Sequence, residues 1–155
     1  MADYFVAASG SNTSPYDTWA KAATSLQTAL TAASTDGDRV IIQYDGVPSG
    51  DSAVSTNTTW TFAASIALIA STNSGTATIT PTPMGTENSL GHSTVAYSIT
   101  MGGAYRVFVY GITLRIPATT ARILLLSTDD LSNFFYENCY FWLGTSGANA
   151  SIQIG

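Results

Sequence analysis

Charged side chains are scarce in this chain of 155 residues, since Asp, Glu, Lys and Arg together make up 10% of it. Soluble domains ordinarily carry about a quarter. A coiled coil or a solvated helical bundle needs charged faces, so the composition excludes both classes. The five basic residues are scattered and the net charge is -5. The chain therefore lacks the basic stripe of a nucleic-acid-binding protein, and we expect no nucleic-acid partner.

Cysteine and histidine each occur once, as Cys139 and His92. One cysteine excludes an internal disulfide framework, and one Cys with one His cannot build a zinc site. We expect Cys139 to be a small buried core residue and His92 to lie in a surface loop. No glycine-rich phosphate loop or dinucleotide fingerprint is present, so we predict no cofactor.

Long apolar runs are also missing. The longest, Ile66–Ala70 and Ile123–Leu126, are far too short to span a bilayer. The N-terminus has no basic region followed by an apolar run, so we expect no secretion signal. What is abundant is apolar residues, at 45%, mixed with Ser, Thr, Asn and Gly. This mixture excludes a disordered chain and is typical of a buried core with β-surface and turns.

One amphipathic helix is predicted near the N-terminus. Its apolar residues fall at i, i+3, i+4 and i+7, on one face: Leu26, Ala29, Leu30 and Ala33. Ser25 or Thr24 is the expected N-cap, and Gly37 follows the last turn. We expect this helix to cover an apolar surface near Val40 and Ile42.

From Arg39 onward the apolar period changes to two, which predicts short strands separated by turn residues. Residues 71–94 show the weakest pattern, and Thr80–Pro83 and Gly85–Gly91 within them are interpreted as a long loop. The expected strands are Val40–Tyr44, Thr59–Phe62, Ile66–Ile69, Ala77–Thr80, Ala96–Met101, Val107–Leu114, Arg122–Ser127, Phe134–Phe141 and Ser151–Ile154, with Asp3–Ala7 before the helix.

An internal echo relates Arg106–Leu114 to Asn133–Phe141 at one constant offset, so that each residue of the first copy has a counterpart in the second. In both copies the alternation of apolar and polar positions shifts by one residue, at Gly111 in the first copy and at Asn138 in the second. Glycine and asparagine are the residues that most readily adopt a positive φ. The echo therefore predicts a strand, a left-handed corner and a second strand in each copy, with the two copies stacked.

The opening segment resembles a known family. The matching residues are Asp3–Val6, Gly10–Asn12, Trp19–Ala20, Leu26–Gln27, Ala29–Leu30, Ala33 and Gly37–Ile42. They are similar to the start of the pectate-lyase-like superfamily of right-handed parallel β-helix proteins, which includes bacteriophage tailspikes. The resemblance implies an all-β fold, a right-handed parallel β-helix (solenoid) with an N-terminal capping α-helix. A β-sandwich is the alternative architecture.

This interpretation divides the chain into two parts. Residues 1–38 form the first strand and the capping helix, and residues 39–155 form coils that continue beyond 155 in the related proteins. We expect Ile152 and Ile154 to stack on Ile123 and Leu125. An uncovered last coil is an aggregation hazard, so a continuation of the chain or another subunit should cover it. The resemblance to virion β-helix proteins, which are commonly trimers, implies a homotrimer or attachment to another virion protein.

Acidic residues are the only other candidates for chemistry, and none forms a convincing pair. Asp129 and Asp130 are adjacent in a turn and point in different directions. Glu137, near the Asn138 corner, is interpreted as a solvated or backbone-bonded residue rather than an acid catalyst. Asp36 and Asp38 are expected to have turn and capping roles. We therefore assign no catalytic, cofactor-binding or metal-binding residue.

Aromatic residues crowd the C-terminal third. With Val107, Val109 and Leu114 facing inward, four aromatic side chains are left for an outward or lateral face: Phe108, Phe135, Tyr140 and Trp142. Exposed aromatic residues mark protein interfaces or sugar-binding ledges, and cover by a neighbouring loop is the third interpretation. We predict these four as interface residues.

Three function classes fit the sequence. The first is a bacteriophage virion structural protein, a tail fibre, tailspike or surface decoration protein with a structural or host-adsorption role. Its partners would be other virion proteins, with cell-surface polysaccharide as a further candidate. The second is a polysaccharide-degrading lyase or glycoside hydrolase whose catalytic coils lie beyond residue 155. The third is a secreted adhesin-like repeat protein, which the missing secretion signal disfavours.

Overall fold

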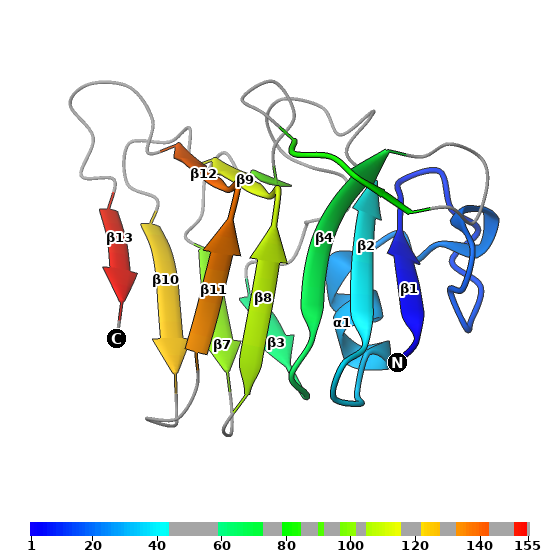
Figure 1. Ribbon diagram of the computed structural model, residues 1–155, viewed down its shortest axis with the longest axis horizontal. Coiled ribbons are helices and arrows are strands. Elements are labelled where there is room, and N and C mark those ends of the chain that lie inside the picture. The colour runs from blue at the N-terminus through cyan, green and yellow to red at the C-terminus, as the bar shows by residue number, and fades with distance from the viewer. Residues whose placement is uncertain are drawn as a thin grey trace.

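The computed structural model describes residues 1–43, 59–72, 79–84, 90–91, 97–101, 105–115, 122–127, 133–142 and 151–154. Within them lie three sheets, a short 3-10 helix and one α-helix (Figure 1). The six-stranded sheet contains β1 (Asp3–Val6), β2 (Arg39–Gln43), β4 (Ala67–Thr72), β8 (Arg106–Tyr110) and β11 (Asn133–Glu137) in that order, with β5 (Thr80–Pro81) beside β4.

The strands of the other two sheets alternate along the chain with those of the six-stranded sheet. The four-stranded sheet has the order β13 (Ser151–Ile154), β10 (Arg122–Ser127), β7 (Tyr97–Met101) and β3 (Thr59–Phe62). The three-stranded sheet has the order β12 (Tyr140–Trp142), β9 (Thr113–Arg115) and β6 (Leu90–Gly91). All pairs are parallel except β4 with β5. In Figure 1 the strands of the four-stranded sheet point opposite to those of the six-stranded sheet.

The predicted fold class, an all-β parallel β-helix with a capping helix, is wrong. The structure is a small mixed domain, built on a mainly parallel six-stranded sheet and one helix. A solenoid of equal coils needs a constant spacing between paired residues. Along this sheet the spacing changes at every step, as the pairs show: Asp3 with Arg39, Arg39 with Ala67, Ala67 with Phe108, and Arg106 with Asn133. The repeat seen between Arg106–Leu114 and Asn133–Phe141 is therefore local and does not continue along the rest of the sheet.

The local echo itself is confirmed. Val107 pairs with Phe134 and Leu114 pairs with Phe141, at the predicted offset. Gly111 and Asn138 have φ values of 72° and 52° and form the corners between the paired strands. The predicted register of Ile123 with Ile152 and of Leu125 with Ile154 is present between β10 and β13.

The long loop predicted at Thr80–Pro83 and Gly85–Gly91 is wrong in part, because β5 and β6 lie within it. Both are two residues long, and two residues show no periodicity that a sequence could reveal. Their extended conformation is decided by the neighbouring strands β4 and β9. The strand predicted at Ala77–Thr80 lies largely outside the described residues.

The helix α1 (Leu26–Ala32) packs as predicted. Leu26, Leu30 and Ala33 are buried in the same apolar cluster as Val40 and Ile42. The cluster extends through Trp60 and Phe62 of β3. Ser25 is at the N-cap position, but its side chain makes no capping hydrogen bond. The buried face of the helix is therefore part of the main core of the domain.

The helix α1 also binds the edge of the four-stranded sheet. The amide group of Gln27 accepts a hydrogen bond from the backbone N–H of Thr61 (3.0 Å) and donates one to the Thr61 carbonyl (3.2 Å). An unpaired strand edge exposes such groups, and the Gln27 side chain here takes the place of a neighbouring strand.

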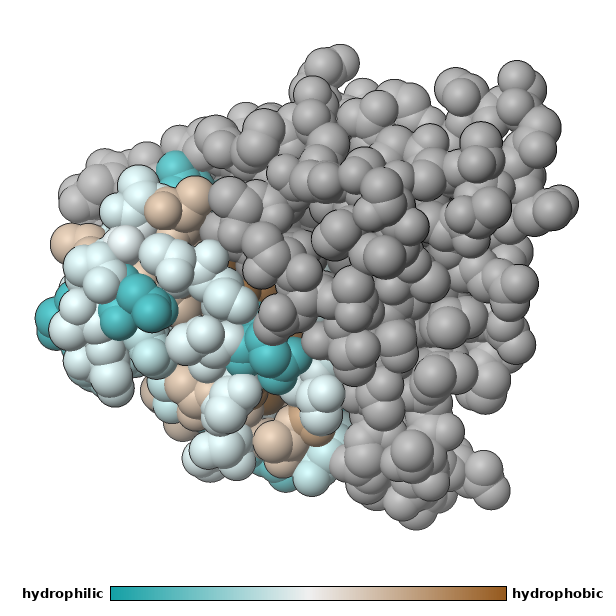
Figure 2. All heavy atoms as spheres, turned by 180° about the vertical axis from the view of Figure 1, so that it is seen from behind, coloured by the Kyte–Doolittle hydropathy of each residue, from teal (hydrophilic) through white to brown (hydrophobic). Residues whose placement is uncertain are grey.

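Seen from behind, the described surface is mostly weakly polar, with few hydrophilic patches (Figure 2). No helix in the described part of the chain is long and apolar enough to cross a membrane.

Candidate functional site

The outer face of the six-stranded sheet carries apolar side chains on every long strand. Inward positions such as Val40, Leu68 and Val107 lie in the main core. The alternate positions point to the other side of the sheet. Two rows of register partners cross this outer face: Phe5, Ile41, Ile69, Tyr110 and Glu137 in one, and Asp3, Arg39, Ala67, Phe108 and Phe135 in the other.

The N-terminal half of the outer face is covered by the chain itself. Phe5 and Ile41 form a second buried cluster with Trp19 and Ala22. Trp19 opens the 3-10 helix η1 (Trp19–Lys21), and its ring meets that of Phe5 edge-on at a centroid distance of 4.7 Å. Aromatic pairs prefer this geometry.

Charges on the covered half are also satisfied within the chain. The Arg39 guanidinium donates to both carboxylate oxygens of Asp3, at 2.6 and 2.7 Å. This two-pronged pairing is the strongest form of ion pair between these groups. The hydrogen bond to Asp3 raises the pKa of Arg39. Among the described outward residues of this half, Phe5 and Ile41 are therefore buried, and Asp3 and Arg39 are paired with each other.

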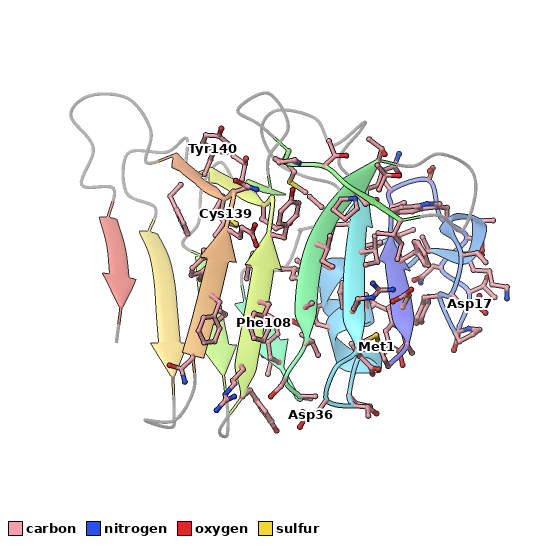
Figure 3. All side chains as sticks on the ribbon, in the orientation of Figure 1. Met1, Asp17, Asp36, Phe108, Cys139 and Tyr140 are labelled. Carbon is pink, nitrogen blue, oxygen red and sulfur yellow. The ribbon has the colours of Figure 1, made fainter. Side chains whose placement is uncertain are left out.

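The C-terminal half is open. Phe108 on β8 is 52% exposed and Phe135 on β11 is 46% exposed. Their rings are stacked, with centroids 4.8 Å apart and planes inclined by 13°. Figure 3 shows Phe108 on the face of the sheet that turns away from α1. We call these two residues the aromatic pair.

A cavity of about 330 Å³ adjoins the aromatic pair. Its wall is formed by β4, β8 and β11, and the residues that line it are Ala67, Ile69, Phe108, Val109, Tyr110, Phe135, Tyr136 and Glu137. Most of this lining is apolar, and its residues with polar side-chain groups are Glu137, Tyr110 and Tyr136. Such a surface can hold an apolar or aromatic group of a partner, with a polar contact at one end.

The four predicted interface residues do not all lie together. The structure brings Phe108 and Phe135 into contact. Tyr140 is 50% exposed but belongs to β12 in the three-stranded sheet, apart from Phe108 (Figure 3). Trp142 pairs with Arg115 at the backbone level, and its side chain lies outside the described part. The predicted exposure of Phe108, Phe135 and Tyr140 is confirmed, and their role as an interface stays a prediction.

Cys139 was predicted as a small buried core residue, and the structure places it half-buried at the border of the core. It packs against the main core beside Tyr136 and Phe141. Its thiol lies 3.4 Å from the Val109 carbonyl and 3.3 Å from the Glu137 carbonyl, so it is a weak donor to the backbone. Burial raises the pKa of this thiol. A raised pKa keeps the thiol protonated at neutral pH, which is the opposite of what a nucleophile needs.

Both carboxylates at the helix-to-strand junction accept backbone hydrogen bonds. The bond from Thr35 to Asp38 fits the predicted turn role, whereas the bonds from Ala2 and Ser65 join distant segments rather than cap the helix. Asp38 is 2% exposed and accepts hydrogen bonds from the backbone N–H groups of Ala2 (2.8 Å) and Thr35 (3.2 Å). Asp36 accepts one from the Ser65 N–H at 2.8 Å. Among the described residues no three of His, Cys, Asp and Glu gather in a way that could hold a metal ion. Asp129, Asp130 and His92 lie outside them.

Three members of the open half were missed by sequence reasoning: Ile69, Tyr110 and Arg106. The alternation of β8 could have revealed Arg106 and Tyr110, because they share the face of Phe108 at i−2 and i+2. Ile69 comes from β4, which lies far before β8 in the chain, and no local signal links the two strands. Glu137, predicted as a solvated or backbone-bonded residue, is exposed and lines the cavity.

Comparisons with known proteins give no further guide. No family model, no curated protein and no solved structure matches this chain.

Proposed function

We propose that this chain is a bacteriophage virion structural protein, a tail fibre, tailspike or surface decoration protein, and that it binds another protein of the particle through the aromatic pair. The observation that carries the proposal is the exposure of two stacked phenylalanines on a sheet face that is covered elsewhere. Aromatic residues of this kind supply much of the binding energy of protein interfaces.

Two further observations support this assignment. The first is the resemblance of residues 3–42 to the start of bacteriophage tailspikes. The second is the composition of the chain, in which charged residues are 10% and Ser, Thr, Asn and Gly are abundant. Exposed apolar patches on otherwise polar surfaces mark places where other molecules bind.

Purified phage particles test the proposal. We expect mass spectrometry to find the chain in particles, and the variant Phe108→Ser/Phe135→Ser to be absent or depleted at least tenfold. The matched control is Tyr140→Ser, which removes an equally exposed aromatic ring from a different sheet. Particles that lack the wild-type chain would contradict the virion role. Equal incorporation of the double variant and the control would contradict the role of the aromatic pair.

A second candidate function is host adsorption by sugar binding at the same surface. The observation that favours it is the Glu137 carboxylate beside the exposed rings. Sugars pack their apolar faces on aromatic rings and donate hydroxyl hydrogen bonds to carboxylates. Binding of the isolated chain to host polysaccharide, lost on Glu137→Gln as well as in the double variant, distinguishes this role from assembly within the particle.

A further inference from the structure

The open half of the outer face carries two charges that the rest of the described chain does not pair. Arg106 lies two residues before Phe108 on β8, and Glu137 lies two residues after Phe135 on β11. Both are exposed. Within the part of the chain that the structure describes, neither side chain forms an ion pair. In this they differ from Asp3 and Arg39, which satisfy each other on the covered half.

The arrangement of these residues is self-complementary. Phe108 and Phe135 are register partners at the centre, and Arg106 and Glu137 lie at opposite ends and on different strands. A two-fold axis in the plane of the face, perpendicular to the line from Arg106 to Glu137, would place Arg106 of one copy over Glu137 of a second copy. The same rotation would keep both aromatic pairs at the centre. This pattern, the same patch on both partners, defines an isologous interface.

We propose that the open half binds a second copy of this chain, face to face, as a two-fold dimer. The proposal rests on the proposed function for the view that this face binds protein, and it names the partner. The aromatic pairs would form the apolar centre, and two Arg106–Glu137 ion pairs would form the polar rim, as in known interfaces. The two sheets would pack with their strand directions reversed and inclined to each other.

The charge pattern also separates this dimer from other assemblies. A trimer, which the sequence analysis predicts, would join two different patches and would not require Arg106 and Glu137 to be mutually complementary. A surface made for an anionic glycan would not keep a carboxylate at its rim. Opposite charges related across the centre of one patch favour a second copy.

Analytical ultracentrifugation of the full chain, over the micromolar range, tests the proposal. We expect a monomer–dimer equilibrium that Phe108→Ser/Phe135→Ser weakens at least tenfold. Arg106→Glu and Glu137→Arg should each weaken it by a similar factor, because each creates two like-charge contacts. The matched control Lys21→Glu reverses an exposed charge in η1, and should leave the dimer unchanged. Thermal unfolding verifies that each variant is folded.

Mixing the two single reversals is the sharpest experiment. In a mixed dimer of Arg106→Glu with Glu137→Arg, both rim contacts again join opposite charges. We expect the mixture to dimerise at least tenfold more tightly than either variant alone, and the double reversal Arg106→Glu/Glu137→Arg to dimerise like the wild type.

A monomer at every concentration, a trimer, or a dimer insensitive to all three positions would overturn the proposal. Binding of host polysaccharide by a strictly monomeric chain would overturn it in favour of the sugar-binding role. These results are independent of the particle experiment. A chain that is found in particles but is monomeric in solution loses the two-fold contact and keeps the virion role.

Discussion

The two halves of the outer sheet face differ in what covers them, although the sheet beneath is continuous. Phe5 on β1 is 2% exposed under Trp19, whereas Phe108 on β8 is 52% exposed. Both are phenylalanines at outward positions of strands in the same sheet. The burial of an outward residue is therefore decided by the segment that folds over it.

The inward faces of the two halves also differ in how deeply their side chains are buried. Val40, Ile42 and Leu68 are at most 1% exposed, because α1 and the neighbouring strands enclose them. On β11 the inward residues Phe134 and Tyr136 are only partly buried and pack at the border of the core. The core side chains are therefore fully buried near α1 and only partly buried near β11. We expect substitutions to be most costly at the enclosed end.

The largest effect is expected at the enclosed end of the core. Leu30 is 0% exposed, and Leu30→Asp would place an unpaired charge in the cluster that joins α1 to β2 and β3. We expect this variant not to fold, as measured by the loss of a cooperative thermal transition. Leu30→Ala should fold with a free energy of unfolding lower by about 2–5 kcal/mol. A cooperatively melting Leu30→Asp protein would show that α1 is dispensable.

The covered and open halves can be compared directly through their aromatic residues. Trp19→Ala should lower the free energy of unfolding by about 3–5 kcal/mol, because it uncovers Phe5 and Ile41. Phe108→Ala should lower it by less than about 1 kcal/mol in the monomer, as is usual for surface positions. Urea unfolding measures both. Equal costs would mean that the open half is as enclosed as the other.

The two corners offer a sharper form of the same comparison. Gly111 has φ +72°, and a Cβ there would lie 2.9 Å from the Cα of Pro83. Gly111→Val should therefore cost about 2–4 kcal/mol through backbone strain and overpacking. The Asn138 corner has φ 52° and is exposed, so Asn138→Gly should change stability by less than about 1 kcal/mol. Chemical denaturation of both variants tests this difference.

The smallest effect concerns pH. Because the folded pKa of Cys139 is raised by burial, the folded chain keeps its thiol proton over a pH range in which the unfolded chain has lost it. Stability should thus fall as pH rises from the unfolded pKa toward the folded one. The difference in melting temperature between wild type and Cys139→Ala should change across this window and be constant below it. Iodoacetamide labelling of the folded thiol should also rise at higher pH than in the unfolded chain.

Much of the local structure could be predicted from the sequence. The strands at Thr59–Phe62, Arg122–Ser127 and Ser151–Ile154 have the predicted bounds. The stripe of Leu26, Ala29 and Leu30 forms the helix. Alternation and helical spacing reflect one buried face, and a buried face is recorded in the order of residues. The constant offset of the echo likewise predicted the register of β8 with β11.

The fold class could not be predicted in the same way. Two stacked copies suggested a uniform solenoid, but the spacing between paired residues is longer from Ala67 to Phe108 than from Arg106 to Asn133. Intervening segments of different length separate the strands, and their lengths do not show which strands become neighbours. The strands β5 and β6 exist only because neighbouring strands pair with them.

The order of residues is enough to place the helix and most strands, to identify inward residues, and to put Phe108 and Phe135 in register. The packing of distant segments determines that Trp19 covers Phe5 while Phe108 stays exposed, and that Arg106, Glu137 and Ile69 lie on the same face as the aromatic pair. The physical reason is the range of the interactions. Periodicity follows from the geometry of a single segment, whereas the cover of an outward face depends on contacts between segments far apart in the chain.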